Sequence, residues 1–534
     1  MNANNKSKKS LAGIAGVVAV ATLISKVFGL VREQIVAAAF GVGAVVNAYA
    51  YAYVIPGFLL ILLGGINGPF HSSLVSVLAK REQKEAAPLI ETITTLVSTI
   101  LLIFTVILVI YADKFIDLLA PGLNSSVRDM AILQLQIMAP LAVFAGLIGI
   151  GFGSLNASDQ YWLPSISPLF SSLTIVIGVG GLFLFLGDKI NAPEYLQFGS
   201  IMLASTTVAG GIWQWLAQQV TQIKLGISTL KLRFDWGREG VNDVMKVMAP
   251  ATLSSGMLHI NVYTDLYFAS YLENAAAAMR YANFIVLTPL GIISNMILVP
   301  FLPVFSRLAA PENWDELKLR IRQGLILTAL TMFPLTAIFM ALSNPIVKII
   351  YERGVFKSGD SAIVAPVLFA YGVGMFFYLA RDVIVRVFYA LGDGQTPFKV
   401  SIINIFINAI LDYLLVKKFE TQGLVFATIS VNIFSIIALI WILHQRLNGL
   451  PLKQWFFIFS GLIITTIISG FSCWGINNLL ISFWGDNGLL LQGINLLTSS
   501  LIAVIIFMLI CMQFKLPELE ILFNKINAKF SRQK

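Results

Sequence analysis

The sequence predicts an all-α, polytopic integral membrane protein with about 14 transmembrane helices: two six-helix lobes in parallel repeat plus two C-terminal helices. Hydrophobic residues make up 57% of the chain and charged residues only 12%, whereas about a quarter of residues are charged in soluble proteins. Apolar segments long enough to cross a bilayer recur from end to end. Basic residues fall mainly in the short loops and tails between these segments, as membrane orientation requires.

Apolar windows of about 20 residues, the length that crosses roughly 30 Å of hydrocarbon, place the predicted spans. Several exceed about 25 residues, which indicates tilt or projection beyond the bilayer. In order, the spans run over Leu11–Phe40, Ala44–Leu78, Pro88–Tyr111, Asp129–Leu155, Tyr161–Leu186, Tyr195–Val220, Val241–Tyr271, Ala275–Leu308, Ile321–Leu342, Ser361–Leu391, Thr396–Val416, Gly423–Leu443, Trp455–Leu479 and Leu489–Met512.

Loop charges predict the orientation. One side carries most of the Lys and Arg, including the N-terminal lysines, Lys224 to Arg238, Lys318 to Arg322 and the C-terminal tail. By the positive-inside rule this side is cytoplasmic, so both termini are predicted in the cytoplasm and the number of spans is even. We therefore expect a multi-pass protein of the inner (plasma) membrane. The net charge of +9 is explained by this loop pattern, so we expect no nucleic-acid partner.

Proline spacing suggests an internal repeat. Pro56 and Pro289 are 233 residues apart, and so are Pro164 and Pro397. We expect an N-terminal six-helix lobe over residues 1–228, a C-terminal six-helix lobe over 229–450, and two extra transmembrane helices with a basic cytoplasmic tail over 451–534. Because six is even, both lobes have the same orientation, which places a substrate path between parallel repeats.

Charged residues interrupt the first span. Lys26, Arg32 and Glu33 lie within an otherwise apolar segment, where an ionised group costs at least about 2.5 kcal/mol on insertion scales and usually marks a transport path. Lys26 and Arg32 are separated by roughly 120° around the helix and about 9 Å along it. They are candidates to bind a phosphate-bearing substrate. The alternative is that they reach the headgroup region or pair with Glu33.

Two later spans also carry charge. Arg280 begins the eighth span with Asn283 one turn on, and a cavity role for Arg280 is about as well supported as that of an interfacial arginine. In the tenth span, Arg381, Asp382 and Arg386 form a cluster. The i, i+4 spacing of Asp382 and Arg386 favours mutual neutralisation, so we predict a structural salt bridge there.

An ion site is predicted near the end of the C-terminal lobe. Asn408 and Asp412 share one face of the eleventh span, Thr428 lies on the twelfth and Asp265 on the seventh. Carboxylate, amide and hydroxyl oxygens suit a hard cation such as Na⁺, although hydrogen-bonded helix packing is an equal alternative. HExxH, GxSxG and Walker A motifs are absent from the sequence, so we expect a transporter, not an enzyme, with no catalytic residue and no required cofactor.

Four segments resemble the MurJ (MviN) family of lipid II flippases, within the multidrug, oligosaccharidyl-lipid and polysaccharide exporter superfamily. They are SerLysValPheGlyLeuValArgGlu (25–33), ValMetAlaProAlaThrLeu (247–253), TyrGluArgGlyValPhe (351–356) and PheTyrAlaLeuGlyAspGlyGlnThrProPhe (388–398), the last being the most distinctive. The resemblance spans essentially the whole chain, including the two C-terminal helices.

This resemblance implies export of an undecaprenyl-pyrophosphate-linked disaccharide pentapeptide from the inner to the outer leaflet, by alternating opening of a cationic cavity between two lobes. It assigns substrate binding to Lys26 and Arg32, and a sodium site to Asp265, Asn408, Asp412 and Thr428. The best-studied members carry further charged residues at positions where this chain has Asn47, Leu60, Ile61, Asn283 and Phe284. Arg280, on the same helix face as Phe284, is a candidate to supply the missing cation. The predicted substrate-binding residues are therefore Lys26, Arg32, Glu33, Asn47, Arg280 and Asn283.

We therefore expect a lipid II flippase acting in cell wall synthesis, with the polyprenyl-pyrophosphate glycolipid, the lipid bilayer and cell-wall synthesis proteins as partners. The alternative is an exporter of another lipid-linked oligosaccharide or of drug-like cations. A membrane-embedded glycan polymerase or acyltransferase would need a sizeable extracytoplasmic loop. The loops of this chain are short.

Overall fold

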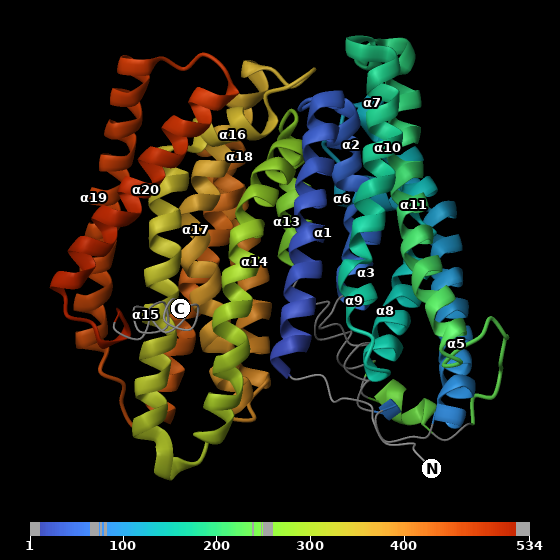
Figure 1. The fold of residues 1–534 in the computed structure, drawn as a ribbon, viewed down its shortest axis with the longest axis horizontal. Helices are drawn as coiled ribbons and strands as arrows, with labels where there is room; N and C mark the ends of the chain where they lie inside the picture. Colours follow the sequence, from blue (N-terminus) through green and yellow to red (C-terminus); the bar gives the residue numbers. More distant parts are fainter. Residues whose placement is uncertain are drawn as a thin grey trace. The chain divides into compact units, whose positions relative to one another are not determined.

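The structure is a computed structural model that describes residues 11–64, 74, 77–78, 83–237, 240–246, 248 and 260–519. Every regular element within these ranges is a helix (Figure 1). Helical backbone satisfies its own hydrogen bonds, which is what a chain this apolar needs inside hydrocarbon. The predicted all-α fold is confirmed.

The contacts divide the chain into two compact units, and the first comprises residues 1–277 and 353–357. The predicted lobe junction at residues 228–229 lies inside this unit. Its described helices are α1 (Leu11–Phe40), α2 (Ala44–Ala52), α3 (Val54–Gly64), α5 (Gln83–Ile110), α6 (Ala112–Leu119), α7 (Ser125–Met138), α8 (Leu141–Ala157), α9 (Trp162–Ile166), α10 (Pro168–Leu186), the 3₁₀ turn η1 (Gly187–Asn191), α11 (Pro193–Lys224) and α13 (Ile260–Ala269).

The second unit comprises residues 278–352 and 358–534. The two extra helices predicted after residue 450 correspond to α19 and α20, whereas the predicted basic tail lies largely outside the described residues. The described helices are α14 (Ala275–Arg307, which begins in the first unit), η2 (Pro311–Asn313), α15 (Trp314–Ala341), α16 (Ser343–Tyr351), α17 (Ser358–Ala390), α18 (Gln395–Arg446), α19 (Leu452–Trp484) and α20 (Leu489–Gln513).

Several predicted spans are bent or merged. Within the described ranges, 8 helices are long and apolar enough to cross a membrane, or up to 10 if each of two bent pairs counts as one span. The bends are 48° between α2 and α3 and 41° between α7 and α8. The 52 residues of α18 include two predicted spans, separated at Glu420 by its φ of 49°. The protein is thus a polytopic membrane protein, and the total of about fourteen spans stays a prediction.

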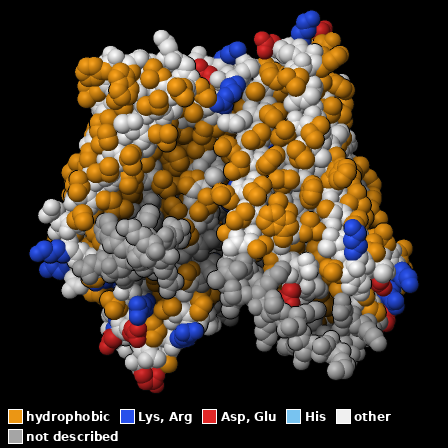
Figure 2. Space-filling model, in the orientation of Figure 1, with side chains coloured by type: hydrophobic (Ala, Val, Ile, Leu, Met, Phe, Trp, Pro, Cys, Tyr) orange, Lys and Arg blue, Asp and Glu red, His pale blue; other side chains and the backbone are white. Residues whose placement is uncertain are grey.

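Apolar side chains also cover the outside of the helices. Figure 2 shows hydrophobic side chains along the lengths of the described helices and charged side chains near their ends. Leu184, Phe185 and Leu490 are among the most exposed. In water such a surface would drive aggregation, but in a bilayer it contacts acyl chains at no cost, so these residues are suited to face lipid.

Small and amide residues bring helices of the first unit close together. A Cβ at Gly151 of α8 would collide with the amide end of the Gln218 side chain of α11, so a larger residue at this position would displace Gln218 from its present contacts. Beside it, Ser154 Oγ accepts a hydrogen bond of 2.5 Å from Gln222 Nε2, and Ser167 Oγ accepts from Gln218 Nε2 at 3.1 Å. Such contacts are typical of membrane bundles, where apolar burial alone gives little drive for association.

Candidate functional site

The charged residues of α1 form an ion pair between neighbours. Arg32 donates from Nε and Nη2 to Glu33 Oε1 at 3.0 and 2.8 Å. The Glu33 side chain is only 1% exposed and that of Arg32 is 24% exposed. Pairing with Glu33, one of the two alternatives for Arg32, is therefore present in the structure. Lys26, six residues earlier, is half-buried and makes no ion pair with any described residue.

Asn47, a further predicted substrate-binding residue, is buried in α2. Its Oδ1 accepts a hydrogen bond from the backbone N–H of Ala277 at 3.3 Å. Ala277 is the third residue of α14, and the first N–H groups of a helix have no partner within it. Asn47 thus accepts a hydrogen bond from one of the first backbone N–H groups of α14, within the first unit.

Arg280 and Asn283 follow on α14, and both are half-buried, as is Phe284. Their i, i+3 and i, i+4 spacing places them on one face of that helix. On α3, Leu60 packs against the apolar cluster of the first unit and Ile61 is largely exposed. The α3 positions at which the family carries arginine are thus part of an apolar surface in this chain.

Three of the four predicted ion ligands come together in α18. Asn408 Nδ2 donates to Asp412 Oδ2 at 2.8 Å, and Thr428 Oγ1 lies 3.5 Å from Asn408 Oδ1. The break at Glu420 makes this contact possible, because it lets the second half of α18 return beside the first. Asn408 and Asp412 are fully buried. Asp265, the fourth predicted ligand, lies buried on α13 of the other unit.

Asn404 was missed by the sequence analysis. It lies one turn before Asn408 and is buried, and its Oδ1 has no hydrogen-bond partner among the described residues. The signal was available, because positions 404, 408 and 412 follow one helix face at four-residue spacing. The group combines one carboxylate with amides and a hydroxyl. The described residues include no cluster of three or more His, Cys, Asp or Glu side chains that could hold a metal ion.

The predicted charge cluster of α17 is arranged differently from expectation. Arg381 reaches both halves of α18, with Nη2 at 3.1 Å from Ser401 Oγ and Nε at 3.4 Å from Ser435 Oγ. Asp382 is 53% exposed, and its ion pair is with Arg381 at 4.0 Å. No ion pair joins Asp382 to Arg386, although both are described. Adjacent residues point in different directions on a helix, so Arg381 lies inward and Asp382 outward.

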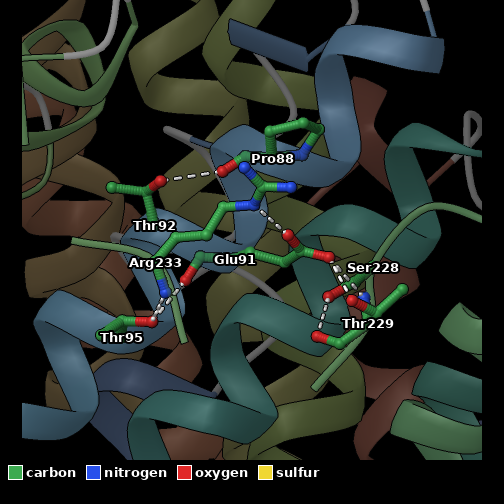
Figure 3. A network of polar contacts seen from close by, with 7 residues as sticks. All are labelled: Pro88, Glu91, Thr92, Thr95, Ser228, Thr229 and Arg233. Carbon is green, nitrogen blue, oxygen red and sulfur yellow. Dashed lines mark hydrogen bonds and ion pairs between the residues drawn. The ribbon is translucent and has the colours of Figure 1, made fainter. Parts of the chain in front are cut away.

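The sequence analysis also missed the buried carboxylate of Glu91 (Figure 3). Glu91 of α5 is 3% exposed, and its Oε1 accepts from both the backbone N–H (3.1 Å) and the hydroxyl of Thr229, while Oε2 accepts from Arg233 Nε. One turn on, Thr95 Oγ1 accepts from the Arg233 N–H at 3.1 Å. These bonds attach the segment after α11 to α5. A lone Glu near the start of an apolar span was the available signal.

The last of the segments that resemble the family, residues 388–398, has a structural role in this chain, whereas residues 247–253 lie, apart from 248, outside the described residues. Asp393, in the loop before α18, accepts from the N–H and hydroxyl of Thr396 at 3.0 and 2.7 Å and from Arg446 Nη1 at 2.8 Å. Burial alone would raise the pKa of the Asp393 carboxyl, but the Thr396 hydrogen bonds and the Arg446 charge outweigh it and hold that pKa below its usual value. The loop thereby connects both ends of α18.

Comparison with known proteins places the chain in a family. The family model described as "Lipid II flippase MurJ" matches residues 36–494. The chain belongs to the MurJ family. It is 60% identical over 532 residues, covering 100% of both chains, to the "Probable lipid II flippase MurJ" of Synechocystis sp. (strain ATCC 27184 / PCC 6803 / Kazusa).

Solved structures agree on the fold. One titled "Lipid II flippase MurJ, inward closed conformation" superposes with a TM-score of 0.75 at 23% identity, covering 93% of this chain and 98% of that one. An inward-facing multidrug resistance MATE family transporter of the MOP superfamily gives 0.61 at 15% identity, covering 81% and 98%. At these identities the likeness concerns the fold alone, and it is shared by MurJ and MATE proteins.

Proposed function

We propose that this chain is a lipid II flippase, which moves the polyprenyl-pyrophosphate-linked peptidoglycan precursor from the inner to the outer leaflet of the plasma membrane. The observation that carries the proposal is the 60% identity, over the whole of both chains, to a protein named a probable lipid II flippase. The polytopic fold and the charged side chains within α1 support it, because a path for a polar head group needs such residues inside an apolar protein.

Lys26, Arg32 and Arg280 are the proposed ligands of the pyrophosphate. A guanidinium has five N–H donors in a planar fork that matches phosphate oxygens. Glu33 engages the Nε and Nη2 groups of Arg32, which leaves Nη1 and the outward N–H of Nη2 for a substrate. Glu33 thus orients the guanidinium and lowers its net charge, so that an anionic head group is bound without being trapped.

Transport would follow from alternating access. The head group enters a cavity open to the cytoplasm, the polyprenyl tail stays in lipid, and movement of the lobes exposes the head group on the other side. Charge placed inside the membrane couples such a cycle to the membrane potential, which is worth about 2.3 kcal/mol per charge per 100 mV.

Na⁺ is the proposed coupling ion. Asn404, Asn408, Asp412 and Thr428, all on α18, provide hard oxygen ligands, and Asp265 on α13 is the further carboxylate that the sequence predicts. The donor set fits, since such ions prefer carboxylate, carbonyl and hydroxyl oxygens. Bound Na⁺ would supply positive charge that neutralises Asp412 and holds the two halves of α18 together.

The test of the function is translocation. Purified protein in vesicles with fluorescent lipid II should move the lipid between leaflets, and the gene should rescue cells depleted of their own flippase. Lys26→Ala and Arg32→Ala should each lower the rate roughly tenfold or more, the worth of one charged hydrogen bond. Lys114→Ala and Arg307→Ala, at exposed positions, are the matched controls. Variants of Lys26 and Arg32 that rescue as well as wild type would contradict the cationic site.

Both termini are proposed to be cytoplasmic. Single cysteines at Lys189, in η1, and at Lys318, near the start of α15, report the two sides, because these lysines lie on opposite predicted faces of the membrane. The native Cys473 and Cys511 are buried. In intact cells an impermeant thiol reagent should label Lys189→Cys and spare Lys318→Cys. The reverse labelling pattern would show that both termini lie outside the cytoplasm.

A further inference from the structure

Two adjoining cavities lie at one end of the second unit. The larger, about 560 Å³, lies beside α16 and α17, and the smaller, about 310 Å³, lies among α16, α19, α20 and the loop between them. They share Ser343, Asn344 and Lys348 of α16. Small-molecule sites measure roughly 300–1,000 Å³, so each cavity can hold a group the size of one sugar.

Buried amides line the smaller cavity. Asn477 is 5% exposed and Asn495 is 2% exposed. Asn495 Nδ2 donates to Gly485 O at 3.1 Å, but its Oδ1 has no hydrogen-bond partner among the described residues, and the Asn477 side chain makes no hydrogen bond within them. Buried amides are normally paired. These therefore have capacity left for a ligand with its own donors and acceptors.

The charges at this cavity cancel. Lys348 Nζ lies 2.6 Å from Asp486 Oδ2, and Gln492 Nε2 donates to the Asp486 backbone O at 3.0 Å. A paired lysine and aspartate offer no excess charge to a free anion or cation. They still present hydrogen-bonding atoms to a neutral polar ligand. Trp474, 57% exposed at the cavity edge, adds an aromatic face on which an apolar ring face can pack.

The larger cavity repeats the same chemistry. Asn344 and Gln422 supply amides, and Glu352 accepts a hydrogen bond from Ser361 Oγ at 2.9 Å. Phe369 adds a partly exposed ring. Hydroxyl-rich ligands need carboxylate and amide partners for their donors and acceptors, together with an aromatic platform. Both cavities meet that requirement.

We propose that the two cavities together bind a disaccharide bearing N-acetyl groups, one sugar in each. The proposal rests on the proposed function and deepens it: the ligand is the sugar portion of the exported head group. The loop charges place Lys348 on the predicted extracytoplasmic side. The site would hold the sugars after the pyrophosphate has crossed, and so disfavour return of the head group.

The experiment measures binding of a soluble sugar, independently of flipping. Full-length protein in nanodiscs is titrated with N,N′-diacetylchitobiose and followed by saturation-transfer NMR and calorimetry. Saturable binding is expected in wild type. Trp474→Ala should weaken it at least about fivefold through the lost aromatic contact. Trp441→Ala, an equally exposed tryptophan on α18 outside both cavities, should leave it unchanged.

Further variants test the amides and the ligand class. Asn477→Leu should abolish detectable binding, while Asn477→Gln, which keeps the amide, should restore part of it in protein of unchanged melting temperature. Absence of saturable binding at millimolar sugar, or equal binding by wild type and Trp474→Ala, would overturn the proposal. Glycylglycine binding in place of the sugar would overturn the ligand class.

Arg32→Ala separates this site from the proposed function. It should lower lipid II translocation and leave disaccharide binding intact. Sugar binding without lipid II translocation by wild type would contradict the flippase proposal alone. Translocation without sugar binding would contradict the sugar site alone.

Discussion

Glu33 and Glu91 are two buried carboxylates in the first unit, and each is paired with an arginine. Comparing them distinguishes a carboxylate of the proposed substrate site from one that attaches two segments of the fold. Arg32, the chain neighbour of Glu33, donates twice to a single oxygen of Glu33, Oε1. Glu91 receives donors on both oxygens from Thr229 and Arg233, more than 130 residues away. Burial and an arginine partner are therefore not enough to mark a binding residue. The arginine of Glu33 is its chain neighbour, whereas that of Glu91 comes from a distant segment, and this difference distinguishes the two.

The difference has a physical meaning. Both carboxylate oxygens of Glu91 already accept hydrogen bonds from the protein, so they are not available to a ligand. Loss of this carboxylate would detach the segment after α11 from α5. The Arg32–Glu33 pair joins two residues that the helix already holds together, so it adds little to the fold. The ion pair orients the Arg32 guanidinium and leaves some of its N–H groups to donate hydrogen bonds to a phosphate.

The largest expected effect is that of Glu91→Gln. A glutamine presents an NH₂ group where one of the two carboxylate oxygens accepts, so it must oppose Thr229 or Arg233. We expect a loss of about 2–3 kcal/mol, the cost of disrupting a buried, charge-assisted network. Thermal unfolding in detergent measures it, with the exposed Glu194→Gln as the matched control. Equal melting of the two variants would show that the network does not stabilise the fold.

Glu33→Gln should have a smaller effect on stability and a larger one on transport. The amide oxygen can take the place of Oε1 and keep both Arg32 bonds, so we expect a loss below about 1 kcal/mol. The net charge beside the head group becomes more positive, which should tighten lipid II binding and slow its release. Binding and translocation assays on one preparation measure both. A stability loss as large as that of Glu91→Gln would remove the distinction between the two carboxylates.

Thr95→Val examines the weaker half of the Glu91 network. The substitution removes the hydroxyl that accepts from the Arg233 N–H and donates to Glu91 O, while keeping the side-chain shape. A loss of about 1 kcal/mol is expected, typical of one hydrogen bond. In a double-mutant cycle, Thr95→Val and Glu91→Gln should be less than additive, because both release the same segment. Full additivity would mean that the two contacts act independently.

The sequence predicted the fold and the short-range groups well and the long-range ones poorly. Apolar length predicted α1 at Leu11–Phe40, the bounds it has in the structure, because burial in lipid depends on local composition. Four-residue spacing predicted the Asn408 and Asp412 contact, because residues four apart are neighbours on one helix face. The Glu91 and Arg233 contact depends on how the segment after α11 crosses α5, which local pattern does not encode. The i, i+4 spacing predicted a salt bridge between Asp382 and Arg386. In the structure, Arg381 instead points inward to the serines of α18, and Asp382 is exposed.

Asp393, a third paired carboxylate, extends the comparison outside the membrane, where the smallest effect is expected. Its lowered pKa means that the folded state holds the ionised form more strongly than the unfolded state. The resulting stability is present above the ordinary aspartate pKa of about 3.9 and is lost as pH falls through the lower folded value. Asp393→Asn keeps the contact to the Thr396 N–H but loses the charge that attracts Arg446, which is partly exposed. The melting temperature of wild type should therefore exceed that of the variant by a constant amount above about pH 5, and the gap should shrink below about pH 4. A gap that persists unchanged in acid would show that the Asp393 charge contributes nothing to joining the two ends of α18.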